Sequence, residues 1–266
     1  MRPVTSRYRL ATAAPKPYGV FRSGWTEVGG LRLHARTRDD ATGIRVVLVH
    51  GLAVSHRYLM PTAAELARRH PVAALDLPGF GLSDEPGRVL DTRELADALG
   101  RWLAATGDEP VVLLGNSYGC QVIVDLVARR PAVAAALVLA GPTVDPAARS
   151  ATRQVLRWLA DVPRERPSQG PILLRDARDA GWRRLAGTLR HSVRDRIEDT
   201  LPAVPVPALV VRGGVEPIVP ARWAAQAAAL LPRGELAVLP GSPHNSVYSA
   251  APELAAAVEG FLGRVL

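Results

Sequence analysis

The stretch VVLLGNSYGCQVIVDLVA, residues 111–128, decides the fold of this chain. Its first four residues, Val111–Leu114, have the continuous apolar character of a buried strand, and Tyr118–Ala128 has the apolar periodicity of a helix. Between them lies GNSYG, residues 115–119, whose glycines allow a turn too sharp for larger side chains. Such a turn lifts the Ser117 hydroxyl above the sheet and onto the positive end of a helix dipole. Ser117 is therefore a candidate nucleophile.

Short apolar and β-branched runs alternate with helical patterns along most of the chain. The predicted strands are Gly24–Val28, Leu31–Arg36, Arg45–Val49, Pro71–Leu75, Val111–Leu114, Ala135–Leu139, Ala208–Val211 and Glu235–Leu239. The predicted helices are Tyr58–Arg69, Thr92–Ala105, Tyr118–Ala128, Ala221–Leu231 and Pro252–Leu262. The first two strands flank two glycines and form a hairpin. Continuous apolar strands between helices indicate an α/β fold, with a mostly parallel sheet covered by helices on both faces.

The alternation breaks once, between Pro142 and Pro202. This segment has no convincing strand and instead shows arginine-rich helical patterns, at Arg149–Ala160 and Gly181–Glu198, around a proline-rich turn. We expect residues 142–202 to form a helical insertion, and residues 1–141 and 203–266 to form the core. The arginines of the insertion could attract an anionic substrate or an acidic carrier, or they could form a solvated helix face.

The amino-acid composition limits the kinds of partner that we expect for this chain. The net charge is +8, and Lys16 is the only lysine among 33 basic residues. The pairs Arg68-Arg69 and Arg129-Arg130 end predicted helices, where cations suit the helix dipole, and do not gather with aromatics as on a nucleic-acid-binding face. No apolar run reaches the roughly 20 residues of a membrane span, and the N-terminus lacks the apolar stretch of a secretory signal. We expect a cytoplasmic protein with a small-molecule substrate, and neither nucleic acid nor a membrane as partner.

Further segments complete a resemblance. Val47–Gly51, DLPGFGLS at residues 76–83 and GNSYG at 115–119, together with Val210–Pro220 and Gly241–Pro252, resemble the α/β-hydrolase superfamily. The similarity is to its branch of capped esterases, C–C hydrolases, haloalkane dehalogenases and epoxide hydrolases. It implies an α/β-hydrolase fold of eight strands, with the insertion as a cap over the site. The dehalogenases and epoxide hydrolases carry aspartate where this chain has Ser117, which disfavours both activities and leaves acyl transfer to water.

A serine hydroxyl needs a base to take its proton. His244 follows the last predicted strand, in the loop where the resemblance places the catalytic histidine. For the third member, the resemblance points to Glu216, which stands where the family usually has aspartate. Asp145 is the alternative, because some family members take their acid from the end of the strand before it; otherwise Asp145 would cap a helix. Either carboxylate would orient the imidazole.

A carbonyl under attack becomes an oxyanion, which needs two N–H donors at about 3 Å. The predicted donors are Tyr118, directly after the nucleophile, and Leu52, in the loop after Arg45–Val49. His56 lies near that loop and is a candidate for lining the substrate pocket. Trp158 and Trp182 in the insertion are candidates for an apolar acyl pocket, although helical amphipathicity alone would explain both. We find no metal-ligand spacing, phosphate loop or dinucleotide fingerprint, and expect no cofactor or metal.

These expectations describe a serine hydrolase that cleaves a carboxylic ester of a small organic molecule through an acyl-enzyme intermediate. Hydrolysis of a C–C bond or a thioester stays open, because the same residues would perform it. A non-hydrolytic cyclase or a ligand-binding member of the fold also stays open, because the triad acid departs from the usual aspartate. The sequence does not indicate the oligomeric state.

Overall fold

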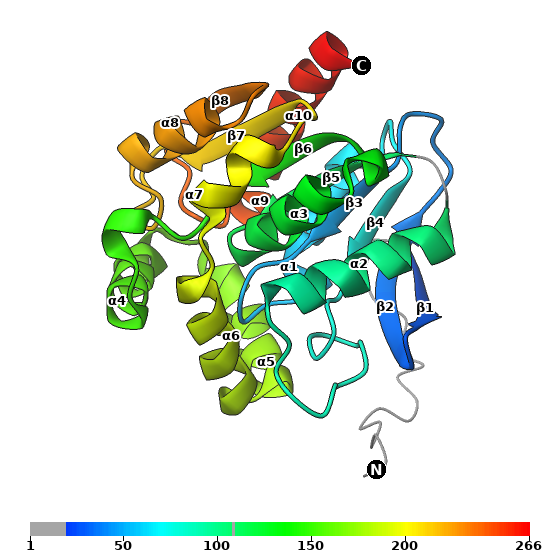
Figure 1. Ribbon diagram of the computed structural model, residues 1–266, viewed down its shortest axis with the longest axis horizontal. Coiled ribbons are helices and arrows are strands. Elements are labelled where there is room, and N and C mark those ends of the chain that lie inside the picture. Colours follow the sequence, from blue (N-terminus) through cyan, green and yellow to red (C-terminus); the bar gives the residue numbers. More distant parts are fainter. Residues whose placement is uncertain (1–19, 108–109) are drawn as a thin grey trace.

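The computed structural model describes residues 20–107 and 110–266, and one eight-stranded sheet runs through them (Figure 1). The strands are β1 (Arg22–Val28), β2 (Leu31–Arg38), β3 (Val46–Val49), β4 (Val72–Leu75), β5 (Val111–Asn116), β6 (Ala134–Ala140), β7 (Ala208–Gly213) and β8 (Gly234–Leu239). Their order in the sheet is β1-β2-β4-β3-β5-β6-β7-β8. The pairs β1–β2 and β2–β4 are antiparallel, and the other neighbours are parallel. The predicted α/β-hydrolase fold is confirmed. Residues 1–19, which by sequence were expected to belong to the core and to lack a secretory signal, lie outside the described residues.

Helices cover both faces of the sheet. They are α1 (His56–Leu66), α2 (Thr92–Thr106), α3 (Tyr118–Arg129), α4 (Ala151–Asp161), α5 (Gly170–Ala180), α6 (Trp182–Arg194), α7 (Ile197–Thr200), α8 (Ala221–Leu230), α9 (Ser246–Ser249) and α10 (Ala251–Val265). Helices α2, α3 and α8 pack on one face, and α1 and α10 on the other. In β3, Val47 and Val49 belong to the first of these cores, and Val46 and Leu48 to the second. This alternation explains why the strand is apolar at every position.

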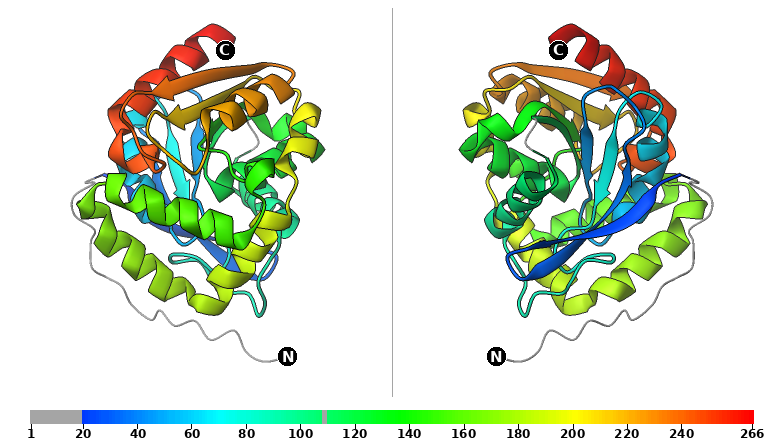
Figure 2. Two further views of the ribbon diagram at one scale, coloured as in Figure 1. Left: turned by 90° about the vertical axis from the view of Figure 1, so that its left-hand side faces the viewer. Right: turned by 90° about the vertical axis from the view of Figure 1, so that its right-hand side faces the viewer.

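The chain between β6 and β7 forms a helical insertion that carries α4 to α7 and fits a cap. In the left-hand view of Figure 2, α4, α5 and α6 lie on the side of the molecule that faces the viewer. Side chains of the insertion contact Arg57, Glu85 and the backbone of His244, which follow β3, β4 and β8. The insertion therefore covers the edge where the strands end, which is where open α/β sheets bind ligands.

The sequence analysis did not separate α5 from the proline-rich turn before it. Pro171 lies in the first turn of α5, where a missing N–H removes no intrahelical hydrogen bond. Proline at this place starts the helix instead of breaking it. None of the helices in the described part of the chain is both long and apolar enough to cross a membrane.

Candidate active site

Ser117 lies at the sharp turn between β5 and α3. Its φ is +54°, in a backbone region that residues other than glycine rarely adopt. The glycines on either side have no room for a side chain: a Cβ on Gly119 would lie 2.4 Å from the carbonyl oxygen of Val49, and one on Gly115 would lie 2.7 Å from the carbonyl oxygen of Gly119. The close packing of β3, β5 and α3 therefore holds Ser117 in a strained turn with its hydroxyl above the sheet.

His244 and Ser117 both lie beside the end of β6. The backbone N–H of Ser117 donates to the carbonyl oxygen of Ala140 at 2.9 Å. The next residue, Gly141, lies against the His244 ring, since a Cβ there would be 2.8 Å from Cε1 of His244. On its other side the ring binds a carboxylate: Nδ1 of His244 is 2.5 Å from Oε2 of Glu216. Nε2 of His244 is buried and has no hydrogen-bond partner among the described residues, so it is free to accept a proton.

The carboxylate of Glu216 is buried and held from both sides. Its Oε1 accepts a hydrogen bond from the N–H of Gly213 at 2.8 Å, and its Oε2 faces His244. Burial by itself would lower the pKa of His244, but the carboxylates of Glu216, Asp161 and Glu165 together outweigh it, and the pKa is raised. The surroundings thus stabilise the imidazolium that a general base becomes.

Asp145, the alternative acid, lies elsewhere. Its carboxylate pairs with Arg157 at 2.9 Å and with Arg222 at 2.5 Å, and it accepts a hydrogen bond from the N–H of Ala147. Burial would raise the pKa of Asp145, but the two guanidinium groups lower it. Asp145 therefore caps the turn that begins the insertion and holds two arginines, whereas Glu216 holds His244.

Two carboxylates of the insertion that the sequence analysis missed bind the loop that carries His244. Oδ1 of Asp161 accepts from the N–H of His244 at 3.4 Å, and Oε1 of Glu165 accepts from the N–H of Asn245 at 2.7 Å. Oε2 of Glu165 is buried and has no partner in the described part of the chain. Burial and the neighbouring Asp161 raise the pKa of Glu165 to about 8. No local pattern could have revealed this contact, because about 80 residues separate its two sides.

The two predicted oxyanion donors belong to segments that adjoin Ser117. A Cβ on Gly51 would lie 3.1 Å from Cβ of Ser117, so the loop that carries Leu52 touches the nucleophile candidate. The Gly51 N–H is already used, since it donates to the hydroxyl of Tyr58 at 2.9 Å. Tyr118 is the first residue of α3, where N–H groups have no acceptor within the helix. Tyr118 directly follows Ser117, and Leu52 directly follows a residue that touches it, so both stay the predicted oxyanion donors.

His56 belongs to a buried cluster. Nδ1 of His56 and Nδ1 of His34 lie 2.7 and 2.8 Å from the same oxygen of Asp76. These three residues could supply metal ligands, with atoms all within 4.8 Å of one another. The distances are those of direct N–H···O bonds, and the other nitrogen of His34 is 2.6 Å from the Ser23 hydroxyl. Hydrogen bonds between these side chains account for the cluster, and they anchor His56 beside Asp76 at the start of α1.

Trp158 and Trp182 do not form the walls of an enclosed pocket. Trp158 on α4 is 46% exposed, and Trp182 at the start of α6 is 74% exposed. The Trp182 ring is covered in part by the guanidinium of Arg183, 5.6 Å from its centre. Both indoles are thus largely accessible to solvent, and their place in an acyl pocket stays a prediction.

Comparison with known proteins places the chain in a family. The family model described as "Alpha/beta hydrolase family" matches residues 46–258. This chain belongs to the α/β-hydrolase family. A relative from Mesorhizobium japonicum, 2-(acetamidomethylene)succinate hydrolase, is 24% identical over 88% of this chain and 92% of its own length.

Solved structures show the same fold. A bacterial membrane phospholipase A superposes with a TM-score of 0.79 at 22% identity, over 92% of this chain and 86% of that one. An esterase from Thermogutta terrifontis superposes with a TM-score of 0.72 at 22% identity, over 92% of this chain and 99% of the other. This chain is an α/β-hydrolase enzyme by fold and family.

Proposed function

We propose that this α/β-hydrolase is a serine hydrolase that cleaves a carboxylic ester of a small organic molecule through an acyl-enzyme on Ser117. The observation that carries the proposal is the hydrogen bonding of the two ring nitrogens of His244. Its Nδ1 is bound to the Glu216 carboxylate at 2.5 Å, while its Nε2 is buried and unpartnered in the described part of the chain, at the strand end that Ser117 also contacts.

In the proposed first half-reaction, Oγ of Ser117 attacks the ester carbonyl while Nε2 of His244 takes its proton. The carbonyl oxygen becomes an anion that accepts hydrogen bonds from the N–H groups of Leu52 and Tyr118. His244 then gives the proton to the leaving alkoxide, and the alcohol departs. Glu216 keeps the Nδ1 proton in place and stabilises the imidazolium in between.

In the second half-reaction, a water molecule gives a proton to Nε2 of His244 and attacks the acyl group on Ser117. The tetrahedral intermediate collapses, the acid product leaves, and Oγ of Ser117 regains its proton from His244. The water supplies the hydroxyl of the acid and the proton that restores the serine. The chemistry uses side chains and backbone N–H groups of the core throughout.

The test is labelling and turnover with one substitution. A fluorophosphonate should add to Ser117, and the purified chain should hydrolyse short p-nitrophenyl esters. Ser117→Ala should remove the label and lower kcat by about 10⁴-fold or more, with the fold kept by circular dichroism. Labelling that survives Ser117→Ala would overturn the assignment.

A panel of an ester, an acyl thioester and a β-diketone of equal acyl length separates the possible reactions. The proposal expects the highest kcat/KM on the ester. Ser117-dependent cleavage of the thioester or the diketone alone would keep the triad and replace the substrate class. Tight binding of these compounds without turnover would favour a ligand-binding protein.

A further inference from the structure

Helix α4 faces inward with its polar side. The amide of Gln154 donates to the carbonyl oxygen of Ala148 at 2.9 Å, and the guanidinium of Arg157 binds the carbonyl oxygen of Ile218 at 3.1 Å. One turn further, Asp161 accepts from the N–H of His244. Gln154 and Asp161 are the buried residues of this helix, which the structure describes in full. The side that holds α4 to the molecule is therefore made of hydrogen bonds and charges.

The apolar side of α4 faces away from these contacts. Five residues of α4 and the position after it are between 42% and 60% exposed: Val155, Leu156, Trp158, Leu159 and Val162. At 100° per residue, these five positions share one broad side of the helix, and we call them the α4 apolar face. A contiguous exposed apolar surface of this kind marks an interaction site, because nothing in the fold gains from leaving it in water.

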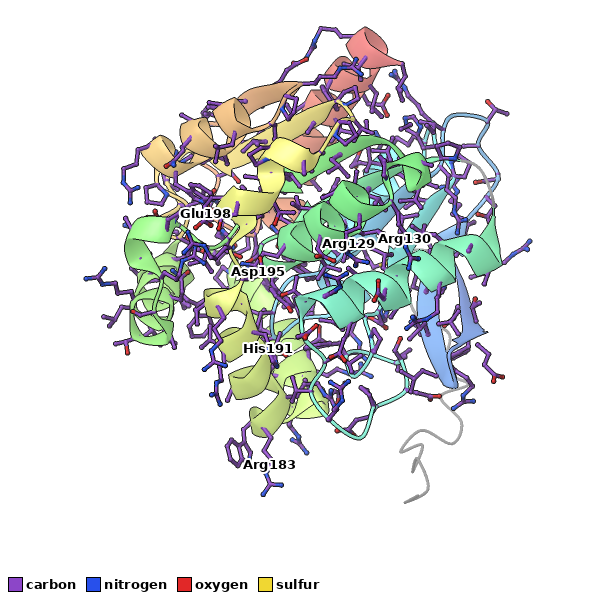
Figure 3. The ribbon with its side chains drawn as sticks, in the orientation of Figure 1. Arg129, Arg130, Arg183, His191, Asp195 and Glu198 are labelled. Carbon is purple, nitrogen blue, oxygen red and sulfur yellow. The ribbon has the colours of Figure 1, made fainter. Side chains whose placement is uncertain are left out.

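The exposed charged residues of α4 and the segment directly after it, residues 151–166, are all arginine. Within residues 142–202, all of which the structure describes, nine arginines are exposed: Arg153, Arg164, Arg166, Arg175, Arg178, Arg183, Arg190, Arg194 and Arg196. Only Asp179 and Asp199 of the eight acidic residues in this segment are exposed. Figure 3 shows Arg183 projecting outward from the end of α6. The insertion thus exposes many more cations than acids, which attracts an anionic partner.

We propose that the α4 apolar face docks the insertion on an anionic lipid surface. Helices that lie in a bilayer interface combine leucine and tryptophan on one side with arginines that reach anionic headgroups. The face carries Leu156, Leu159 and Trp158, and two more protruding apolar side chains, Leu174 at 71% and Trp182 at 74% exposure, lie on neighbouring helices. Protruding apolar side chains enter a bilayer, whereas a rigid protein partner would need a matching hollow for each.

This docking departs from the expectation that a membrane is not a partner, although it needs no membrane span. The expectation of no membrane partner rested on the missing apolar run of about 20 residues. A peripheral helix needs only one apolar side and a charge match. The inference stands on exposure and charge, and does not depend on the ester hydrolysis proposed above.

Vesicle binding tests the proposal with the full chain. Co-sedimentation compares phosphatidylcholine vesicles with vesicles in which about a third of the lipid is phosphatidylglycerol. The wild type should bind the anionic vesicles roughly tenfold more tightly, and added salt should weaken that binding. Leu156→Ser combined with Leu159→Ser should reduce the binding by roughly tenfold or more.

Matched controls make each result decisive. Leu236→Ser combined with Val238→Ser changes two apolar residues of similar exposure, 42% and 49%, on β8, and should keep full vesicle binding. Circular dichroism and turnover of a water-soluble ester should be the same in both double variants and the wild type. No vesicle binding by the wild type, or undiminished binding by the α4 variant, would overturn the proposal.

Two other occupants of the face would also overturn it. If light scattering finds a dimer that the α4 variant converts to a monomer, the face is an interface between copies of this chain. If an acidic carrier protein binds the face while anionic vesicles do not, the partner is a protein. Loss of soluble-ester turnover in Ser117→Ala with vesicle binding intact would separate a failure of this inference from a failure of the proposed reaction.

Discussion

Helices α3 and α4 are similar in length and both are amphipathic, but α3 buries its apolar side and α4 buries its polar side. Helix α3 of the core buries a continuous apolar set that includes Val122, Ile123 and Leu126. Helix α4 of the insertion buries Gln154 and Asp161 and exposes its apolar side. The core is therefore held by apolar burial, and the insertion is held to it by directed polar contacts.

The polar contacts of the insertion converge on loops around the candidate active site. Asp176 of α5 accepts a hydrogen bond from Ser55 at 2.8 Å and pairs with Arg57 at the start of α1. Buried Arg184 of α6 pairs with Glu85 at 2.9 Å. We therefore expect substitutions in the core to lower the stability or the catalytic rate. Substitutions in the insertion should leave the protein folded and alter its binding and its response to pH.

The largest effect should come from the core acid, when compared with the acid of the insertion. Glu216→Gln keeps the shape but lets the wrong tautomer of His244 form, so kcat should fall by about 10³–10⁴-fold in ester turnover assays. Glu216→Asp should keep more of the activity, because a carboxylate remains.

Asp145→Asn is the matched control for this prediction. It should leave the turnover of the folded molecules nearly unchanged and lower stability instead, because Arg157 and Arg222 lose a buried partner. Equal losses of turnover from Asp145→Asn and Glu216→Gln would remove the distinction between the two acids.

A pair of alanine substitutions tests whether the apolar sides of α3 and α4 differ in burial. Ile123→Ala in α3 deletes a fully buried side chain and should lower the free energy of unfolding by about 2–5 kcal/mol. Leu156→Ala on the α4 apolar face should change it by no more than about 0.5 kcal/mol. Urea unfolding measures both. A similar loss in the two variants would mean that the apolar side of α4 is buried in solution.

The smallest effect concerns the contact between the insertion and the His244 loop. The pKa of Glu165 is raised to about 8, so the folded state binds its proton more tightly than the unfolded chain. Its stabilising effect is then complete below the ordinary glutamate pKa of 4.5 and is lost as the pH rises to about 8. Glu165→Gln imitates the protonated form and keeps an acceptor for the N–H of Asn245. Its Tm should therefore gain a few degrees on the wild type between pH 5 and pH 9.

Asp195→Asn provides a control with a different pH window. Asp195 (Figure 3) is a second buried acid of the insertion, and burial raises its pKa to about 7. The Tm of Asp195→Asn relative to wild type should stop changing near pH 7, while that of Glu165→Gln should go on changing to about pH 8. A Tm difference between Glu165→Gln and wild type that does not vary with pH would show that Glu165 is ionised throughout.

Most of the core could be predicted because its signals are local. The predicted inner strands are short apolar runs, and the first two flank a pair of glycines. Each of the eight becomes a strand of one sheet within a residue or two of its predicted bounds. The GNSYG turn needed only the strand before it and the helix after it to be recognised. The insertion was harder, because helical periodicity states that a helix has two sides but not which of them faces the protein.

The α/β fold could be predicted from the sequence alone. So could the turn at Ser117 and the order in which Ser117, Glu216 and His244 follow their strands. These features follow from apolar runs, glycines and chain order, which neighbouring residues specify. The tertiary structure was needed to show that Glu216 and not Asp145 contacts His244. It was also needed to show that Asp161 and Glu165 reach the same loop, and that α4 turns its apolar side outward. Each of these depends on which distant segments pack together, and packing balances burial, hydrogen bonds and charge over the whole molecule, beyond the reach of any local pattern.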